Sequence, residues 1–282
     1  MRNGAFIATI ALVGAAAVAG PPPVTDCVVT GRLRALGTHA PLEGEVIAYE
    51  LEDGDAFDAR RVARDYVRQP VAKAASGPDG QFQLDLPAGK HTYHLEAAAR
   101  GHVRTFVRDV PATPGKRWIE MSLSPGAPVA GRVIARGGGP VPGALISSGI
   151  ETVVADAKGS FRFEGLPMGK NELVVRAPGL ATQRVDVAAR STFEVLMEPG
   201  NALTGTLRDQ YKRPIAGALV EILEDPGGVL VRSDANGRFE VPDLLGVVTV
   251  MARSGRHRPA TWAGTVPLAR GTLPPAITLQ SF

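Results

Sequence analysis

The chain has 282 residues, of which 33 are glycine and 23 are proline, and its formal net charge is +3. Glycine and proline interrupt helices and central strands. This content therefore argues against long helical bundles and coiled coils, and the lack of a Gly-X-Y period excludes collagen. Because 44% of the residues are hydrophobic, the chain is also unlike a disordered protein. A turn-rich, all-β protein with several small cores is predicted.

Residues 1–19 have the pattern of a secretory signal peptide. Arg2 makes the start positive, residues 5–19 are apolar or small, and residues 17–19 (Ala-Val-Ala) offer a cleavage site. The apolar run is shorter than the roughly 20 residues of a membrane-spanning helix. We therefore predict export, removal of residues 1–19 and no transmembrane span in the mature chain. An uncleaved N-terminal anchor is the alternative.

Cys27 is the single cysteine, so no internal disulfide is possible. It lies just after the apolar run, where a bacterial lipoprotein carries its lipidated cysteine. However, Asp26 precedes it instead of a small residue, and three prolines separate it from the apolar run. The sequence favours Cys27 as a small apolar residue that opens the first strand over a lipid attachment site.

Three segments of the remaining chain share one repeated pattern of turn and apolar residues, which we call the cadence. Each begins with apolar-x-Gly-x-apolar, passes through a Pro-x-x-Gly turn (Pro41 to Gly44 in the first copy) into an apolar run, and then has a turn followed by Gly-x-Phe. The first glycines are Gly31, Gly131 and Gly205, and the phenylalanines are Phe82, Phe161 and Phe239. Alternating polarity after each phenylalanine predicts a half-buried strand with the ring inward. The Asp and Gly before it predict a tight hairpin.

Each copy offers six or seven short strands, which is typical of a small antiparallel sandwich. We predict an all-β chain of three tandem antiparallel Ig-like or transthyretin-like β-sandwich domains. The predicted domains are 25–125, 126–200 and 201–282, and Pro-Gly pairs at 125–126 and 199–200 mark the boundaries.

The first copy carries an insertion around residues 51–70. Its arginines alternate with acidic residues, which favours a solvated face over a nucleic-acid site. The spacing predicts a short helix on the sandwich, and a mobile loop is the alternative. Asp55 or Asp58 would cap the helix. The residues expected to share its inner face are Ala59, Val62, Ala63 and Tyr66.

The combined cadence resembles the carboxypeptidase regulatory-like domain family. The second copy matches best, from Gly131 through Pro142-Gly143-Ala144, residues 156–161 and 166–169, to Gly179. The resemblance implies a transthyretin-like or immunoglobulin-like sandwich with a carbohydrate-binding-like fold. It also implies non-catalytic, extracellular accessory modules, such as those attached to peptidases, glycosidases or outer-membrane receptors. No peptidase catalytic domain accompanies them in this chain.

Motifs for catalysis or cofactor binding are missing from the sequence. It has no His-Glu-x-x-His, Gly-x-Ser-x-Gly, phosphate-binding loop or dinucleotide fingerprint. Asp53, Asp55 and Asp58 lack the spacing of a calcium loop. We therefore predict no cofactor, no metal and no enzymatic activity. The enzyme alternative needs His39 and the Asp53–Asp58 cluster to converge.

The candidate contact residues lie at two places. Trp118 is out of phase with its inward-facing neighbours on a predicted strand, so it should face away from the core. Its outward position is explained by a contact with a sugar or a protein, or by a domain interface. Tyr66, Arg61 and Arg64 lie in the insertion.

We predict a non-catalytic bacterial binding or structural module that is secreted, periplasmic or attached to the cell surface. Its expected partner is a protein or polysaccharide at the cell surface, and no nucleic-acid partner is expected. The alternatives are a carbohydrate-binding protein and an accessory or regulatory subunit of an extracellular hydrolase.

Overall fold

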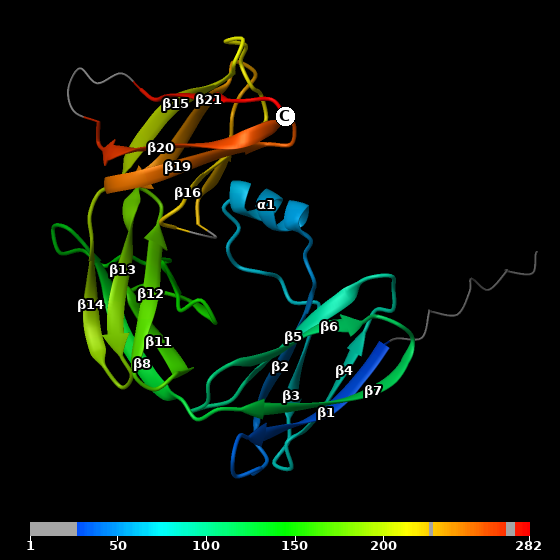
Figure 1. Ribbon diagram of the computed structural model, residues 1–282. Coiled ribbons are helices and arrows are strands. Elements are labelled where there is room, and N and C mark those ends of the chain that lie inside the picture. Colours follow the sequence, from blue (N-terminus) through cyan, green and yellow to red (C-terminus); the bar gives the residue numbers. More distant parts are fainter. Residues whose placement is uncertain (1–26, 226–227, 269–273) are drawn as a thin grey trace, which may run out of the picture.

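The computed structural model describes residues 27–225, 228–268 and 274–282. The predicted signal peptide lies outside these residues. The described chain forms three β-sandwich units in succession (Figure 1), as the sequence predicts. Within the described residues, no helix combines the length and the apolar character needed to cross a membrane.

The three units consist of consecutive elements. Unit 1 contains β1 (Cys27–Ala35), β2 (Gly44–Glu50), α1 (Gly54–Val62), β3 (Ala72–Ser76), β4 (Gln81–Leu86), β5 (Thr92–Ala98), β6 (Thr105–Pro111) and β7 (Gly115–Leu123). Unit 2 contains β8 (Ala127–Ala135), β9 (Leu145–Ser147), β10 (Thr152–Val154), β11 (Ser160–Leu166), β12 (Lys170–Ala177), β13 (Leu180–Ala188) and β14 (Thr192–Met197). Unit 3 contains β15 (Asn201–Asp209), β16 (Leu219–Ile222), β17 (Leu230–Arg232), β18 (Arg238–Leu244), β19 (Gly246–Ser254), β20 (His257–Val266) and β21 (Ala276–Leu279).

Each unit packs a three-stranded sheet on a four-stranded sheet. In unit 1 the strand orders are β4-β1-β7 and β3-β2-β5-β6, and units 2 and 3 repeat these orders. The first and last strands of every unit pair in parallel, whereas the other pairs are antiparallel. The sandwich prediction is confirmed, and the parallel pair is an addition to it. Five intervening strands separate the two partners, so no tight hairpin forces them to run in opposite directions.

The repeated glycine and phenylalanine meet across the three-stranded sheet of each unit. Gly31 pairs with Phe82, and the corresponding pairs are Gly131 with Phe161 and Gly205 with Phe239. The three rings are only 3–5% exposed. A Cβ atom on Gly31 would lie 2.6 Å from the Phe82 ring, and the other two glycines are equally crowded. The cadence therefore records one packing contact repeated three times, which confirms the predicted equivalence.

Each unit has its own hydrophobic core between its two sheets. Cys27 is fully buried in the first core at the start of β1, in the place predicted for a small apolar residue. Trp262 is half-buried against the core of unit 3.

No long flexible linker separates neighbouring units. A turn in units 1 and 2 forms a backbone hydrogen bond with the segment that begins the next unit. The Gly126 N–H donates to the Gly101 carbonyl at 2.8 Å, and the Gly200 N–H donates to the Gly179 carbonyl at 2.9 Å. These two glycines belong to the Pro-Gly pairs that the sequence places at the domain boundaries. Backbone hydrogen bonds at a joint restrict the relative motion that is otherwise expected between domains.

A β-bulge in the receiving unit completes each joint. The pairing of β11 with β8 shifts register before Leu166, and the pairing of β18 with β15 shifts before Leu244. The pairing of β4 with β1 in unit 1 is continuous. A Cβ atom on Gly165, in the bulge of unit 2, would lie 1.9 Å from the His102 carbonyl oxygen of unit 1. The bulge thus brings the two backbones into direct contact.

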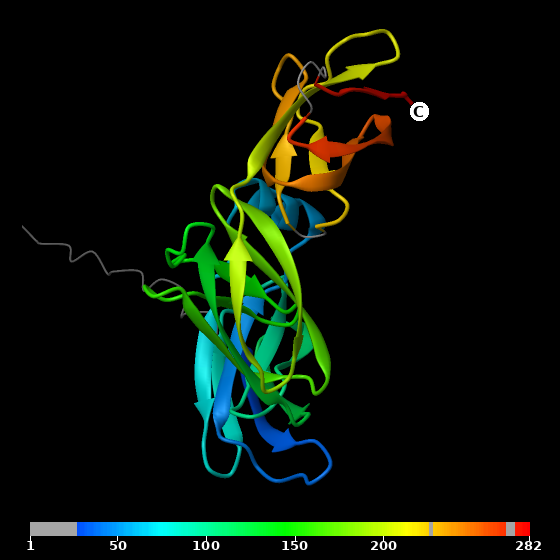
Figure 2. The same cartoon turned by 90° about the vertical axis from the view of Figure 1, so that its left-hand side faces the viewer.

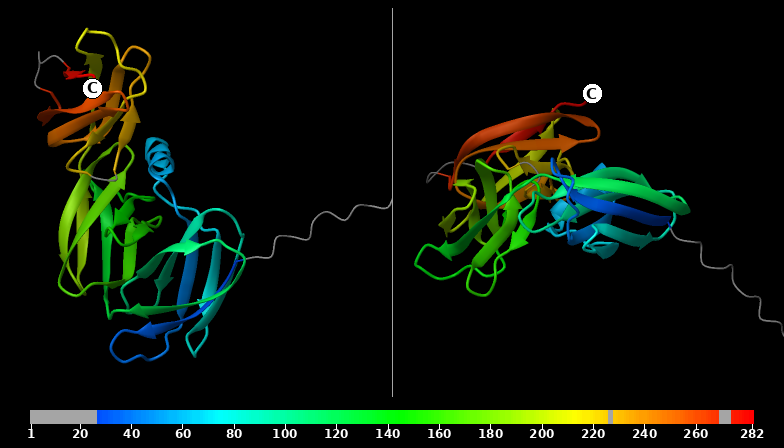
Figure 3. Two further views of the ribbon diagram at one scale, coloured as in Figure 1. Left: turned by 45° about the vertical axis from the view of Figure 1, so that its right-hand side comes forward. Right: turned by 90° about the horizontal axis from the view of Figure 1, so that it is seen from below.

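The insertion of unit 1 forms helix α1, which stands away from its own sandwich and lies beside unit 3 (Figures 2 and 3). Its N-cap is Asp53, whose Oδ1 accepts a hydrogen bond from the Ala56 N–H at 2.8 Å. The predicted caps, Asp55 and Asp58, are therefore wrong. The predicted apolar inner face is also wrong, because Asp58 and Arg61 are the buried residues of the helix.

The end of the helix departs from the prediction as well. The helix ends at Val62, so Tyr66 lies beyond it, and Ala59 and Ala63 are exposed. The face was predicted wrongly because the helix packs on a charged surface of unit 3 and not on the apolar core of unit 1.

Candidate functional site

Helix α1 is fixed to unit 3 by a closed ring of four charged side chains, Asp58, Arg61, Glu221 and Arg253. Arg61 lies 2.9 Å from Glu221, and Arg253 lies 2.6 Å from Asp58. The ring closes through Arg61 and Asp58 at 3.6 Å and through Arg253 and Glu221 at 3.5 Å. With two arginines and two carboxylates it is formally neutral. A buried charged cluster of this kind is tolerated because each member has opposite charges around it.

Arg61 is the most enclosed member of this charge ring, with a side chain that is 4% exposed. Its Nε also donates to the Gly228 carbonyl of unit 3 at 3.1 Å. The hydrogen bond from Arg253 to Asp58 raises the pKa of Arg253 above its ordinary value. Arg253 thus keeps its positive charge toward Asp58 and Glu221.

A second contact links the insertion to both other units through Asp243. This residue sits in the β-bulge of unit 3 with φ +62°. Its Oδ1 accepts a hydrogen bond from the Gly179 N–H of unit 2 at 2.9 Å, and its Oδ2 lies 3.6 Å from Arg64. Asp243 therefore joins the three units at one point.

Tyr66 lies at the same junction. Its ring lies under the guanidinium of Arg176 of unit 2, 5.8 Å from the ring centre. Arg176 in turn forms an ion pair with Asp225 of unit 3. Burial raises the pKa of Tyr66 above its ordinary value, with Arg176 opposing the shift. The insertion therefore lies within an intrachain junction built by all three units.

The structure brings three of the four candidate contact residues together. Arg61, Arg64 and Tyr66 meet at the junction, whereas Trp118 lies apart on β7 and is 58% exposed. Its outward orientation agrees with the predicted phase, and so large an exposure leaves its ring uncovered by another unit. A role of any of the four toward an external partner stays a prediction.

Sequence reasoning missed the residues of unit 3 that receive the insertion. Glu221 and Arg253 lie on strand faces that read as ordinary solvated positions. Asp243 could have been found from spacing, because four residues lie between Phe161 and Leu166 and between Phe239 and Leu244, whereas three lie between Phe82 and Leu86. The extra residue is the bulge.

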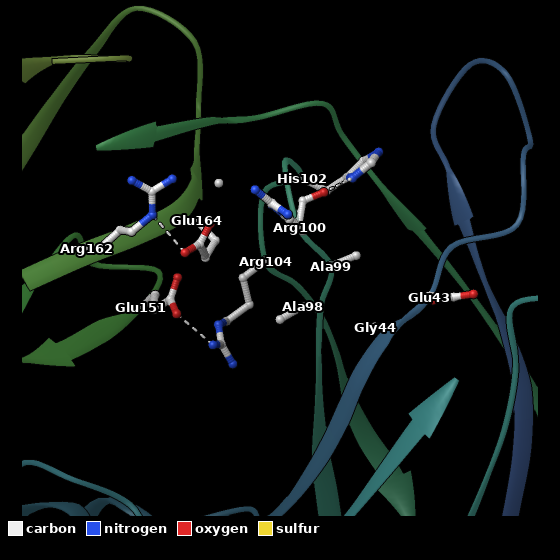
Figure 4. A pocket seen from close by; sticks show the side chains of 11 residues that line it. Glu43, Gly44, Ala98, Ala99, Arg100, His102, Arg104, Glu151, Arg162 and Glu164 are labelled. Atoms are coloured by element: carbon white, nitrogen blue, oxygen red, sulfur yellow. Dashed lines mark hydrogen bonds and ion pairs between the residues drawn. The ribbon is translucent and has the colours of Figure 1, made fainter. Parts of the chain in front are cut away.

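A cavity of about 790 Å³ lies between units 1 and 2 (Figure 4). Arg104 of unit 1 and Glu151 of unit 2 point toward one another across it and pair at 2.7 Å. Arg104 also lies 3.2 Å from Glu96, and Arg162 pairs with Glu164 on the opposite wall. Most charges on these walls therefore already have opposite charges beside them, so the cavity serves as a polar joint between the units.

The residue set of the enzyme alternative does not converge. His39 lies in the turn before β2 and the Asp53–Asp58 cluster lies after it. His39 and the aspartate cluster therefore lie near opposite ends of β2, whose seven residues span about 20 Å. Asp53 caps α1 and Asp58 belongs to the charge ring, so both have structural roles. Among the residues described, no group of three or more His, Cys, Asp or Glu is arranged to hold a metal ion.

Comparison with known families gives one match. Residues 128–197 match the family model of the carboxypeptidase regulatory-like domain. The matched span is unit 2, where the cadence is most complete. The same assignment for units 1 and 3 stays a prediction, although their strand order repeats that of unit 2.

Solved structures that resemble the whole chain do so only distantly. A streptococcal ancillary pilin is 13% identical over 91% of this chain and 99% of that chain, with a TM-score of 0.29. BcpA, the major pilin subunit of Bacillus cereus, is 11% identical over 91% and 99%, with a TM-score of 0.26. The Bacillus anthracis TIE protein is 15% identical over 91% and 50%, with a TM-score of 0.25. Scores this low carry no argument about function. No curated protein matches the chain. Unit 2 is thus similar to carboxypeptidase regulatory-like domains.

Proposed function

We propose that this protein is a non-catalytic structural or binding module of a bacterial cell envelope. Its three sandwich domains, 25–125, 126–200 and 201–282, would be held in one bent arrangement. The observation that carries the proposal is the charge ring, which fixes a helix of the first domain to the third. Together with the two backbone joints it closes a loop of contacts, so no domain can turn without breaking one of them. Such closure suits a protein that presents surfaces at a set spacing.

The envelope location rests on the signal-peptide pattern of residues 1–19. Export would release a chain that begins near residue 20, with Cys27 inside the first core and not lipidated. Cell fractionation with mass spectrometry of the N-terminus tests this. A mature start after Ala19 in the periplasmic or surface fraction is expected. A full-length chain confined to the cytoplasm would contradict the proposal.

A binding role predicts a partner at an exposed aromatic surface. We expect a photo-cross-linking amino acid in place of Trp118 to capture a protein or polysaccharide of the envelope in living cells. The same amino acid in place of Tyr211, which is 68% exposed on unit 3, is the matched control. Equal adducts at both positions, or none at either, would contradict a specific contact at Trp118.

Two further functions share this framework. A carbohydrate-binding protein is favoured by the exposed Trp118, and retention on polysaccharide that Trp118→Ala abolishes would support it. An accessory or regulatory subunit of an extracellular hydrolase is favoured by the family similarity of unit 2. Co-purification of a hydrolase from the envelope would support that second function.

A further inference from the structure

Unit 1 carries a row of neighbouring aromatic and arginine side chains on the outer face of its four-stranded sheet. The aromatic row consists, in order, of Arg68, Tyr49, His94, Phe106 and Arg108. The Arg68 guanidinium lies 4.5 Å from the centre of the Tyr49 ring, and the Arg108 guanidinium lies 5.2 Å from that of Phe106. Between them, the centres of Tyr49 and His94 are 6.5 Å apart and those of His94 and Phe106 are 5.5 Å apart.

The backbone aligns the row. Tyr49 on β2 is directly opposite His94 on β5, and Phe106 on β6 is opposite the next outward residue of β5, Glu96. Strand β6 then bulges beside His94, where Asp109 takes φ +58°. Alternation along β6 puts Arg108 on the same outer face as Phe106, and the bulge after it returns Val110 to the core.

The two terminal arginines are held with their hydrogen-bond donors available. Each guanidinium lies over an aromatic ring, a contact that uses none of its N–H donors. One N–H group of Arg68 donates a hydrogen bond to the Glu50 carbonyl at 2.6 Å. Among the described residues, neither Arg68 nor Arg108 has a carboxylate within ion-pair distance. The other charges nearby are paired, Arg60 with Glu52 at 2.8 Å and Arg104 with Glu96 at 3.2 Å.

The row opens into a cavity of about 540 Å³, a volume typical of small-ligand sites. Its opposite walls are Leu51 and the start of the insertion, with Phe57, and the Gly149–Ile150 loop of unit 2. Burial lowers the pKa of His94, with Arg68 adding to the shift and Glu96 opposing it, so this ring contributes no charge at neutral pH. The surplus positive charge of the cavity therefore comes from Arg68 and Arg108.

We propose that this cavity binds an acidic saccharide, with two of its uronic-acid carboxylates held by Arg68 and Arg108, one at each end of the row. Arginine fits a carboxylate with two parallel hydrogen bonds. The walls also carry Glu52 and Glu96, whose oxygens accept hydrogen bonds from hydroxyl groups. A sugar acid supplies both carboxylates and many hydroxyl donors, whereas a triglutamate peptide supplies carboxylates without hydroxyls and meets the two glutamates only with its backbone N–H groups. The exposed ring atoms of Phe57 and Phe106 offer apolar contact area to the sugar.

This proposal rests on the envelope role proposed above. Its test uses the purified mature chain and therefore does not depend on where the protein is located. Isothermal titration calorimetry at low salt is run with trimers of galacturonic acid and of mannuronic acid. The comparison ligands are a neutral galactose trimer and a triglutamate peptide. At least one uronate trimer should bind, and both comparison ligands should bind at least about tenfold more weakly.

Two arginine variants locate the binding site. Arg68→Gln and Arg108→Gln should each weaken uronate binding about tenfold, because each removes a charge-assisted hydrogen bond. Arg162→Gln is the matched control, since Arg162 is an exposed arginine that lines the other cavity. Its affinity should equal that of the unaltered protein. Circular dichroism confirms that all variants are folded.

Four results would overturn the proposal. These are no binding of either uronate trimer, equal binding of the neutral trimer, tighter binding of triglutamate, and equal effects of the test and control variants. Any of them leaves the fixed arrangement of the three domains and the envelope location untouched, because other experiments test those.

Discussion

Replacing Arg61 with alanine tests whether the insertion holds unit 1 to unit 3. The side chain makes two hydrogen bonds to unit 3, at 2.9 Å to the Glu221 carboxylate and at 3.1 Å to the Gly228 carbonyl, and it is 4% exposed. A buried charge that loses its partner destabilises a structure by roughly 3–5 kcal/mol. We take about 3 kcal/mol as the loss of docking free energy, because Arg253 still pairs with both acids of the ring.

Hydrogen exchange measured by mass spectrometry reports this loss on residues 54–62. Since about 1.4 kcal/mol corresponds to a tenfold change in an equilibrium, amides of α1 should exchange about one hundredfold faster. Arg60→Ala is the control. Its partners, Glu52 and the Asp65 carbonyl, both lie within the insertion. Unchanged exchange in Arg61→Ala, or an equal acceleration in the control, would refute the reasoning.

The same variant should release the arrangement of the units. Spin labels on cysteines placed at Ser122 of unit 1 and Tyr211 of unit 3, both exposed, report the distance between the two units. Because Cys27 is buried, it should not take up the label. We expect one narrow distance distribution in the unaltered protein and a broad one in Arg61→Ala. A narrow distribution in both would show that the joints alone set the shape.

Three other predictions follow from single contacts. Gly165→Ala should loosen the joint of units 1 and 2, seen as a separate melting transition, because its Cβ would meet a backbone oxygen at 1.9 Å; Gly139→Ala, with open space around it, should not. Phe161→Ala should destabilise unit 2 by about 3–5 kcal/mol in urea unfolding, and an effect below about 1 kcal/mol would contradict its core position. Burial lowers the pKa of His94 below its ordinary 6.5, so unit 1 should lose stability as the pH falls from about 7 to about 5. His94→Gln should flatten that pH dependence, and an unchanged slope would exclude His94 as its source.

The insertion shows where sequence patterns fail. Periodicity predicted a helix, and α1 is present. The predicted inner face was apolar because an isolated amphipathic helix normally packs on a hydrophobic core. Here Asp58 and Arg61 are buried instead, since the surface that receives the helix carries Glu221 and Arg253. No local rule identifies that surface, because it belongs to a unit about 160 residues further along the chain.

The aromatic row was not predicted for a related reason. Alternation along one strand is enough to put His94 and Glu96 on the same face, and they lie 3.1 Å apart. Their neighbours Tyr49, Phe106 and Arg108 come from two other strands. Which strands are adjacent, and in which register, depends on the order β3-β2-β5-β6 and on a bulge in β6. Periodicity within one strand contains no information about either.

The sequence by itself determined the three sandwich units, their hairpins and their repeated core contact. These features rest on turn chemistry and alternation over a few residues, such as the hairpin at Asp156, whose carboxylate accepts the Lys158 and Ser160 N–H groups at 2.8 Å. Only the tertiary structure decided how the units are joined and which surfaces form the cavities. Those contacts pair charges and rings far apart in the chain, and their energy depends on geometry that exists only after the sheets have formed.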